Sequence, residues 1–311
     1  MASTMKAYTT QKALKTVVEN FRKPRQLFMY HPIQFEINGT FPTTKTALFS
    51  KNVNGTTYWL ANMTNVYESI IYLFSLRPLY LFRDRQILTH DGKFREEDFL
   101  AVFDEFCKEN GLFAGSKTPS TVAEKCYTKA IEKYMKKNKI EAQVQNKSSH
   151  FFAMNESQMF KYRHFEDGSL PDGYSINVPD SVEDVSQILG SSITPNAKLV
   201  EEKLRRFPSL CVRKGDELAG FISSETHGAL AHLHVFHSHR GKNLGEKLEI
   251  GAAKMAIENG IRPCKFIDTT NSFFLEKAKK SKMMDVVESN GAPLVFDQNV
   301  YSPASNYGTY Q

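Results

Sequence analysis

Histidines are concentrated in the stretch "HGALAHLHVFHSHRGKNLGEKL" (227–248), which begins with five of the nine histidines of the chain. The imidazole group titrates near neutral pH, so it suits proton transfer as well as metal binding. If the stretch opens with a strand, His232 and His234 share one face, and His227 lies on the other unless Gly228 bends the chain. These three histidines are the candidate catalytic bases.

A metal site is the alternative use of these side chains. An HxH pair on one face of a strand supplies two of the ligands that zinc prefers. However, Glu225 is the only acidic residue close by, and the chain has neither an HExxH motif nor a CxxC pair. The sequence therefore predicts no bound metal.

A basic loop, "HRGKNLG", follows the histidine strand and precedes a helical pattern. Backbone N–H groups at the start of a helix, together with the helix dipole, form a site for phosphate groups. Arg240 and Lys242 add positive charge, and Gly241 and Gly245 allow a ligand to approach the backbone closely. The loop matches neither the Walker pattern GxxxxGK(S/T) nor the dinucleotide pattern GxGxxG. A simple basic turn without a ligand is the alternative interpretation.

The second half of the chain must position this loop, and its pattern predicts the order β-α-α-β-β-β-α-β-α-β. The long strand–helix–strand connection after the histidine strand favours a parallel pair. Asn271 is the expected N-cap of the helix that follows the next strand. Strands are predicted at 174–178, 209–214, 218–225, 229–236, 264–269 and 293–301, and helices at 179–190, 194–207, 245–260 and 271–281.

The first half mixes strands and helices, and the polar stretch 141–150 is the expected domain boundary. The chain is therefore predicted to be an α/β protein with domains at 1–150 and 151–311. Strands are predicted at 32–39 and 56–63, helices at 95–110 and 118–139, and a joining strand at 150–162.

Composition excludes several classes of protein. Hydrophobic residues make up 41% of the chain and charged residues 24%, as in ordinary globular proteins. The net charge of +6 comes without a long Lys/Arg block, so no nucleic-acid partner is predicted. The most apolar stretch, 67–82, is interrupted by Glu68 and Arg77, so no membrane span is expected. The four widely spaced cysteines indicate reduced thiols of an intracellular protein, which we expect to be a monomer.

The N-terminal 25 residues have no acidic residue before Glu19 and carry three lysines ahead of it, as a mitochondrial presequence would. Apolar residues at helical spacing favour instead a helix of the folded domain. We expect a cytoplasmic protein, with the mitochondrion as the alternative. The apolar residues are Leu14, Val17, Val18 and Phe21.

The loop Arg240–Gly245 resembles the R/Q-x-x-G-x-G/A loop of the GCN5-related N-acetyltransferase superfamily, which cradles the pyrophosphate of coenzyme A. The strand before it resembles the L-x-V-x-x-x-x-R strand of that superfamily, with Leu233 and Val235 in the apolar places. The predicted element order is also similar. The resemblance implies a C-terminal domain of this fold, a mixed central sheet flanked by helices. It also implies acyl-CoA binding by Leu233, Val235, Arg240, Gly241, Lys242, Asn243, Leu244, Gly245 and Asn271.

Three further segments resemble the glycine N-acyltransferase family: "EEKLRRFPSLCVRKGDELAGF", "CKFIDTTNSFF" and "QFEING". This resemblance implies transfer of an acyl group from acyl-CoA to the amine of glycine or another small amine. It also implies that residues 1–150 form the smaller α/β N-terminal domain of that family.

Two positions depart from these patterns. Asn243 stands where the superfamily loop has its first glycine, although asparagine tolerates left-handed backbone angles. Ala229 stands where glycine acyltransferases have a glutamate proposed as the general base. His227, two residues earlier, therefore becomes the first candidate base, ahead of His232 and His234. The backbone N–H groups at 235–236 are the candidate donors to the oxyanion, and no residue is assigned as the general acid. The alternative function is that of a coenzyme-A-binding protein with weak catalysis.

Overall fold

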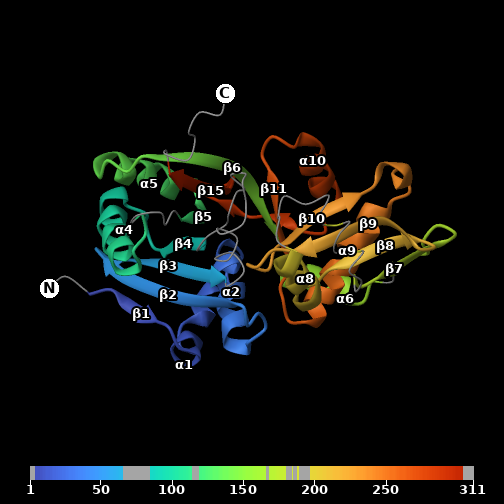
Figure 1. Cartoon of the computed structure of the whole chain (residues 1–311), viewed down its shortest axis with the longest axis horizontal. Helices are drawn as coiled ribbons and strands as arrows, with labels where there is room; N and C mark the ends of the chain where they lie inside the picture. Colours follow the sequence, from blue (N-terminus) through green and yellow to red (C-terminus); the bar gives the residue numbers. More distant parts are fainter. Residues whose placement is uncertain are drawn as a thin grey trace. The chain divides into compact units, whose positions relative to one another are not determined.

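The computed structural model describes residues 4–65, 85–113, 119–165, 168–179, 184, 188 and 197–303. The chain divides into two compact units (Figure 1). One comprises Met1–His150 and Leu294–Gln311, and the other comprises Phe151–Pro293. Each unit has a mixed sheet covered by helices, so the predicted α/β class is confirmed.

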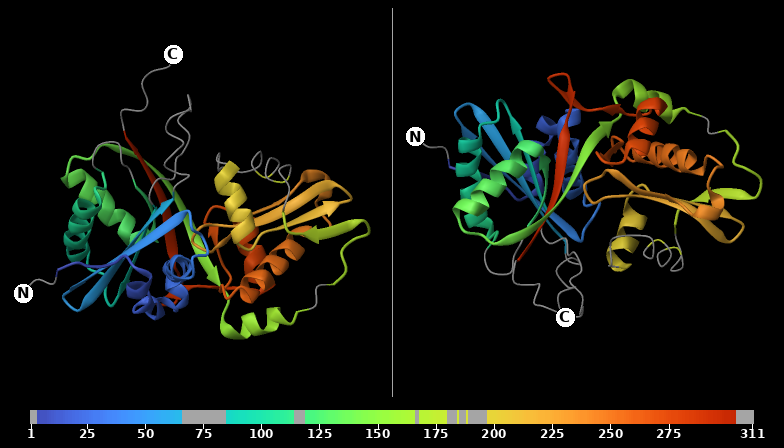
Figure 2. Two further views of the ribbon diagram at one scale, coloured as in Figure 1. Left: turned by 60° about the horizontal axis from the view of Figure 1, so that its bottom comes forward. Right: turned by 90° about the horizontal axis from the view of Figure 1, so that it is seen from above.

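The first unit has the strand order β1-β2-β3-β4-β5-β15-β6. β2, β3 and β4 are antiparallel, and α4 connects β4 to the parallel strand β5. Helices α4 and α5 lie side by side and bury an aromatic core against the sheet (Figure 2). The bounds are β1 Lys6–Tyr8, α1 Gln11–Lys15, η1 Val18–Phe21, η2 Pro24–Gln26, α2 Leu27–Asn38, β2 Thr44–Val53, β3 Thr56–Asn65, β4 Arg85–Asp91, α4 Glu96–Asn110, β5 Ser120–Glu124, α5 Lys125–Lys137, β6 Ala142–Ala153 and β15 Val295–Pro303.

Two sequence predictions for the first unit are wrong. Residues 32–39, predicted as a strand, belong to helix α2, because Met29 and Ile33, four residues apart, are both fully buried. The alternation that suggested a strand covers only the end of a helix that is apolar on most sides. The helix predicted at 118–139 begins only at Lys125, since Ser120–Glu124 is a strand paired with β4 and β15.

The N-terminal apolar residues Leu14, Val17, Val18 and Phe21 are buried, so this stretch belongs to the folded chain. The apolar stretch 67–82 lies outside the described residues. Within the described ranges, no helix has the length and apolar character needed to cross a membrane.

The second unit repeats the pattern of three antiparallel strands, a helix and a parallel strand. β8, β9 and β10 are antiparallel, and α9 connects β10 to the parallel β11, as predicted. Helices α8 and α9 cover opposite faces of these strands (Figure 2). The bounds are α6 Glu156–Arg163, β7 Tyr174–Asn177, α8 Ala197–Arg206, β8 Leu210–Lys214, β9 Glu217–Ser224, β10 Leu230–Val235, η4 His237–His239, α9 Leu244–Glu258, β11 Cys264–Asp268, α10 Ser272–Ser281, β12 Asp285–Val286, β13 Glu288–Ser289 and β14 Ala292–Pro293.

Two expectations for the second half differ from the structure, and a third falls mostly on residues that the structure does not describe. The joining strand predicted at 150–162 ends at Ala153, because Asn155 and Gln158 form a capping box that starts helix α6. The last strand, β15, pairs with β5 and β6, so it belongs to the first unit and not to a domain at 151–311. The helix predicted at 179–190 lies largely outside the described residues.

Candidate active site

Strand β10 contains a bulge at its centre. Ala231 pairs with Ser223 and His234 pairs with Phe221 of β9, so β10 has one extra residue between these two pairs. His232 lies in the bulge with φ 53°, a left-handed conformation that non-glycine residues seldom adopt. A bulge re-aims the side chain it carries, which explains why His232 departs from the regular alternation of the strand.

The neighbouring strand accommodates the bulge through a glycine. A Cβ atom on Gly220 of β9 would lie 2.6 Å from the carbonyl oxygen of His234 and 3.1 Å from Cα of Val235. Any larger residue would therefore push the two strands apart at this point.

Past the bulge, β10 separates from its parallel neighbour β11. Leu230 with Lys265 is the only pair recorded between these two strands, both of which are fully described. On the other side, the N–H of Phe236 donates to the carbonyl of Ala219 at 3.0 Å. Since N–H directions alternate along a strand, the N–H of Val235 points away from β9. Of the two predicted oxyanion donors, the N–H of Phe236 is therefore already used in a hydrogen bond to β9. The N–H of Val235 faces the side where β11 has separated.

The basic loop is held by its own polar groups. Arg240 Nε donates to the carbonyl of Val235 at 3.0 Å, and Lys242 Nζ donates to the carbonyl of Ser238 at 3.3 Å. Gly241 has φ 77° and Asn243 has φ 59°, so both occupy the left-handed region. Asn243 therefore adopts the left-handed backbone conformation that asparagine tolerates.

Helix α9 begins directly after this loop and presents free backbone donors. The N-cap residue Asn243 makes no side-chain capping hydrogen bond, and the carbonyl of Asn243 accepts from Lys247 at 3.3 Å. The N–H groups of Leu244, Gly245 and Glu246 precede that first helical bond and therefore point out of the helix start. This arrangement suits an anionic group.

A pocket of about 750 Å³ opens over the loop and the helix start. Gly245 borders it beside β10, where an added Cβ would lie 3.7 Å from Val235 and 3.9 Å from Leu233. Most of the predicted coenzyme-A residues meet here, whereas Lys242 and Asn271 do not line the pocket. The lining residues are Leu233, His234, Val235, His239, Arg240, Gly241, Asn243, Leu244, Gly245, Phe273, Phe274 and Lys277.

The aromatic side of the pocket was missed by the sequence analysis. Phe273 is 70% exposed and Phe274 is 39% exposed, and their ring centroids lie 5.4 Å apart. Lys277 follows one helical turn later on α10. Asn271 caps this helix as predicted, with its side chain accepting from the N–H of Phe274 at 3.2 Å. Two adjacent aromatic residues in the first turn after the N-cap were the available signal.

His227 does not occupy the strand position that made it the first candidate base. Gly228 has φ 84°, and its N–H donates to the carbonyl of Glu225 at 2.8 Å, so the chain turns before β10 begins. His227 is 2% exposed in this turn, beside the ring of Phe266, and does not line the pocket. His227 is the first candidate base only if a strand runs straight through Gly228, and the turn at Gly228 means that it does not.

The other two histidines have distinct surroundings on β10. His232 Nε2 lies 2.6 Å from Glu225 Oε1. His234 lines the pocket, and its ring stacks on Phe221 with the centroids 5.7 Å apart. Partial burial and the charge of Arg240 lower the pKa of His234 below its usual value, which keeps its imidazole neutral at neutral pH. The bulge therefore separates the two side chains that a regular strand would pair.

No group of three or more metal-ligating side chains occurs among the described residues. The two histidines of the HxH pattern have different partners: His232 contacts the carboxylate of Glu225, and His234 stacks on the ring of Phe221.

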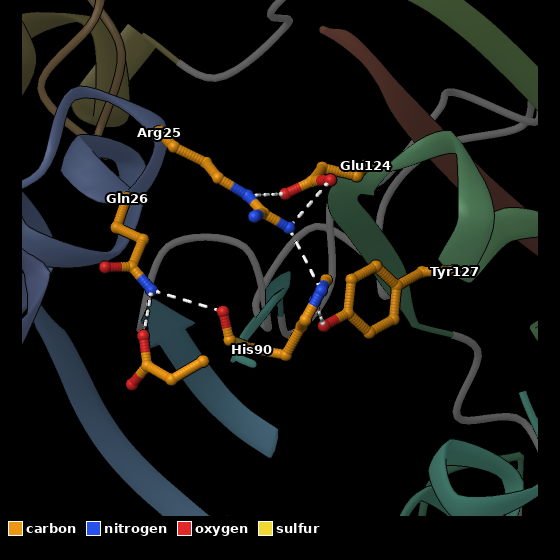
Figure 3. Close-up of polar contacts among 6 residues, drawn as sticks. Arg25, Gln26, His90, Glu124 and Tyr127 are labelled. Atoms are coloured by element: carbon orange, nitrogen blue, oxygen red, sulfur yellow. Dashed lines mark hydrogen bonds and ion pairs between the residues drawn. The ribbon is translucent and has the colours of Figure 1, made fainter. Parts of the chain in front are cut away.

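The first unit contains a buried histidine, His90, held in a network of polar contacts (Figure 3). Arg25 donates from Nε and Nη2 to Glu124, and a second Nη2 contact reaches His90 Nε2 at 3.1 Å. His90 Nδ1 lies 2.7 Å from the hydroxyl of Tyr127, so both ring nitrogens are occupied. Burial, with a contribution from Arg25, lowers the pKa of His90 to about 4. This imidazole is therefore a neutral structural group at neutral pH.

Comparison with known proteins gives matches to solved structures only. No family model and no curated protein matches the sequence. A Drosophila protein is similar over 97% of this chain and 100% of its own, with a TM-score of 0.67 and 12% identity. A GCN5-related N-acetyltransferase from Kribbella flavida is similar over 80% of this chain and 88% of its own, with a TM-score of 0.49 and 11% identity. A GCN5-related N-acetyltransferase-like protein from Streptococcus suis is similar over 94% of this chain and 98% of its own, with a TM-score of 0.44 and 10% identity. The first of these likenesses shows a shared fold.

Proposed function

We propose that the protein transfers an acyl group from a coenzyme A thioester to an amine. The observation that carries this proposal is the start of α9, where free backbone N–H groups, a left-handed Asn243 and Arg240 border one pocket beside the bulged strand. A pyrophosphate group fits such a helix start because it needs several convergent donors and positive charge. The sequence resemblance of this loop to the coenzyme-A loop of N-acetyltransferases points to the same ligand.

The rest of the pocket suits the other parts of coenzyme A. Leu233 and Val235 offer an apolar strand edge for the pantetheine arm, and the exposed rings of Phe273 and Phe274 offer a stacking surface for adenine. Lys277, one turn further along α10, provides a cation for a ribose phosphate. Lys242 and Asn271 remain candidates for outer contacts.

The chemistry requires a donor for the thioester oxygen and an acceptor for the amine proton. The N–H of Val235 faces the side where β10 and β11 separate, so it can stabilise negative charge on that oxygen. The amine nitrogen forms a bond to the carbonyl carbon and gives up a proton. The C–S bond then breaks, and the coenzyme A thiolate leaves and takes up a proton.

We propose His232 as the proton acceptor. It does not itself line the pocket, but its neighbour Leu233 does. It lies two residues past the last β10–β11 pair, its side chain is 25% exposed, and a carboxylate holds one of its ring nitrogens. His234 is the second candidate, because it is neutral and lines the pocket. His227 falls to third place because it is buried in the turn before the strand.

The acceptor remains glycine or another small amine, as the resemblance to glycine N-acyltransferases implies, and the second unit is the proposed catalytic domain. A coenzyme-A-binding protein with weak catalysis is the alternative. Ala229, which is 1% exposed, supports it, because no acidic group stands where those enzymes have their glutamate.

Two measurements test the proposal. Calorimetry with coenzyme A should show stoichiometric binding, and a thiol-release assay over acyl-CoAs crossed with amino acids and small amines should show turnover. Binding without turnover on any amine favours the alternative, and absence of binding would refute both.

A further inference from the structure

A chain of three polar side chains leads from helix α8 to the bulge of β10. Lys203 Nζ lies 3.3 Å from Glu225 Oε1, and the same oxygen lies 2.6 Å from His232 Nε2. The side chains of Lys203, Glu225 and His232 are 6%, 22% and 25% exposed. The innermost member is therefore a buried lysine and the outermost an accessible imidazole.

The backbone at His232 is strained to make this contact. A non-glycine residue seldom adopts the left-handed region, and such strain persists where surrounding structure imposes it. Here the flanking β9 pairs at Ala231 and His234 and the absence of a side chain at Gly220 hold the bulge in place. In a regular strand, His232 would follow the alternation of its neighbours.

The contact defines which nitrogen of His232 carries the proton. A carboxylate only accepts hydrogen bonds, so Nε2 must carry a hydrogen and donate it to Glu225. In the neutral ring, Nδ1 then keeps its lone pair. Among the described residues, no hydrogen bond to Nδ1 of His232 is recorded, in contrast to His90, whose two nitrogens are both engaged.

Lys203 has a separate role in this chain. Its ammonium group is almost fully buried, and a buried charge is tolerated when it is paired. The ion pair anchors the Glu225 carboxylate to α8 and balances its charge. Removing the lysine should leave the carboxylate without its anchor, whereas removing the glutamate should leave a buried lysine uncompensated.

We propose that Glu225 and Lys203 are positioning residues that present Nδ1 of His232 as the proton acceptor for the attacking amine. This inference rests on the proposed function. In the step, the amine nitrogen bonds to the thioester carbon, the amine proton moves to Nδ1, and the C–S bond breaks. The imidazolium then returns its proton to the leaving thiolate, so the ring is neutral again.

The first test reads the tautomer and needs no activity. In the ¹⁵N-histidine-labelled protein at neutral pH, two-bond ¹⁵N–¹H correlation spectra should show His232 in the Nε2–H form. His164, an exposed histidine of the same unit whose ring contacts Phe160 and not a carboxylate, is the reference. Glu225→Gln should move His232 toward the pattern of His164. An Nδ1–H ring in the parent protein, or a spectrum unchanged by Glu225→Gln, would overturn the inference.

The second test is kinetic. Glu225→Gln should lower kcat by about 10–100-fold, as loss of a carboxylate that orients a functional histidine does, with little change in KM for acyl-CoA. Glu225→Asp should recover part of the loss. Glu201→Gln is the matched control, since Glu201 pairs with Arg205 at 2.7 Å on α8 and is outside both the pocket lining and the proposed chain.

Calorimetry separates this inference from the proposed function. If Glu225→Gln binds coenzyme A like the parent and keeps full kcat, the positioning role is wrong and the proposed function stands. If the parent protein itself does not bind coenzyme A, the proposed function fails, while the tautomer measurement still reports on the Lys203–Glu225–His232 chain.

Discussion

The turn from β4 into α4 and the turn from β10 into α9 occupy the same place in two units with the same local topology. In each, the third of three antiparallel strands leads into a helix that returns to a parallel strand. The strands themselves differ. β4 is unbroken and pairs with β5 at four successive residues, whereas β10 is bulged and pairs with β11 at one recorded position. Of these two parallel pairs, β10–β11 is therefore the less extensively paired.

Charge at the two helix starts also differs. The first turn of α4 carries Glu96, Glu97 and Asp98, which match the helix dipole but repel an anionic ligand. The first turn of α9 carries only Glu246 and follows a loop with Arg240 and Lys242. The same helix end therefore carries three acidic side chains in one unit and follows a basic loop in the other.

Several polar groups near the β4–α4 turn of the first unit are hydrogen-bonded to one another. The hydroxyl of Tyr58 donates to the carbonyl of Arg95 and accepts from its N–H, each at 3.0 Å, so the α4 turn is closed by a side chain. His90 is likewise held by Arg25 and Tyr127. The two turns thus share a topology, and the local sequence decides whether side chains close the turn, as at α4, or leave the backbone donors of the helix start uncapped, as at α9.

The largest expected effect is on His232. His232→Ala should lower kcat by about 10²–10⁴-fold, the usual contribution of a general base, with little change in coenzyme A affinity. His164→Ala, an exposed control, should retain parent activity. If His234→Ala loses more activity than His232→Ala in steady-state assays, the base is His234.

Acid should destabilise the first unit through His90. Its pKa falls from 6.5 to about 4 on folding, so the folded state resists protonation that the unfolded state accepts. The contribution of His90 to the free energy of unfolding is fully present above pH 6.5. It decreases by about 3 kcal/mol in total as the pH falls toward 4. Urea unfolding at pH 7 and pH 4 should show this loss in the parent and a smaller one in His90→Gln. Equal losses would mean that His90 does not titrate in this way.

Charge reversal at the loop sharpens the contrast between the two helix starts. Arg240→Glu should weaken coenzyme A binding by about 100-fold, since charge-assisted hydrogen bonds contribute roughly 1.5–3 kcal/mol. Arg95→Glu, at the start of α4, should bind like the parent in the same calorimetric titration. Equal affinity of Arg240→Glu and the parent would exclude this loop as the phosphate site.

The smallest expected effect concerns the aromatic side of the pocket. Phe273→Ala should weaken binding of coenzyme A by about tenfold, because a base stacked on an aromatic ring contributes roughly 1–3 kcal/mol. It should not affect binding of 4′-phosphopantetheine, which lacks adenine. Phe160→Ala is the control, because Phe160 is equally exposed, at 70%, on α6. An equal loss of affinity for both ligands would mean that Phe273 contacts the pantetheine part of coenzyme A and not the adenine.

The sequence by itself determined most elements of the second unit and the loop between β10 and α9. The N-cap Asn271 and the basic loop between strand and helix are local signals, and the structure has these features where the sequence predicts them. Local signals suffice there because backbone angles and caps depend on a few adjacent residues.

Tertiary structure decided the features that depend on distant partners. The bulge at His232 needs Gly220 on another strand, and the contact of His232 with Glu225 follows from it. The strand at Ser120–Glu124 exists because β4 and β15 pair on its two sides. The alternation of "ALAHLHV" placed His232 and His234 together and made His227 the leading candidate, whereas one extra residue in the strand and the turn at Gly228 separated all three. A shift of one residue reverses the face of a side chain, and only pairing with a neighbouring strand sets that register.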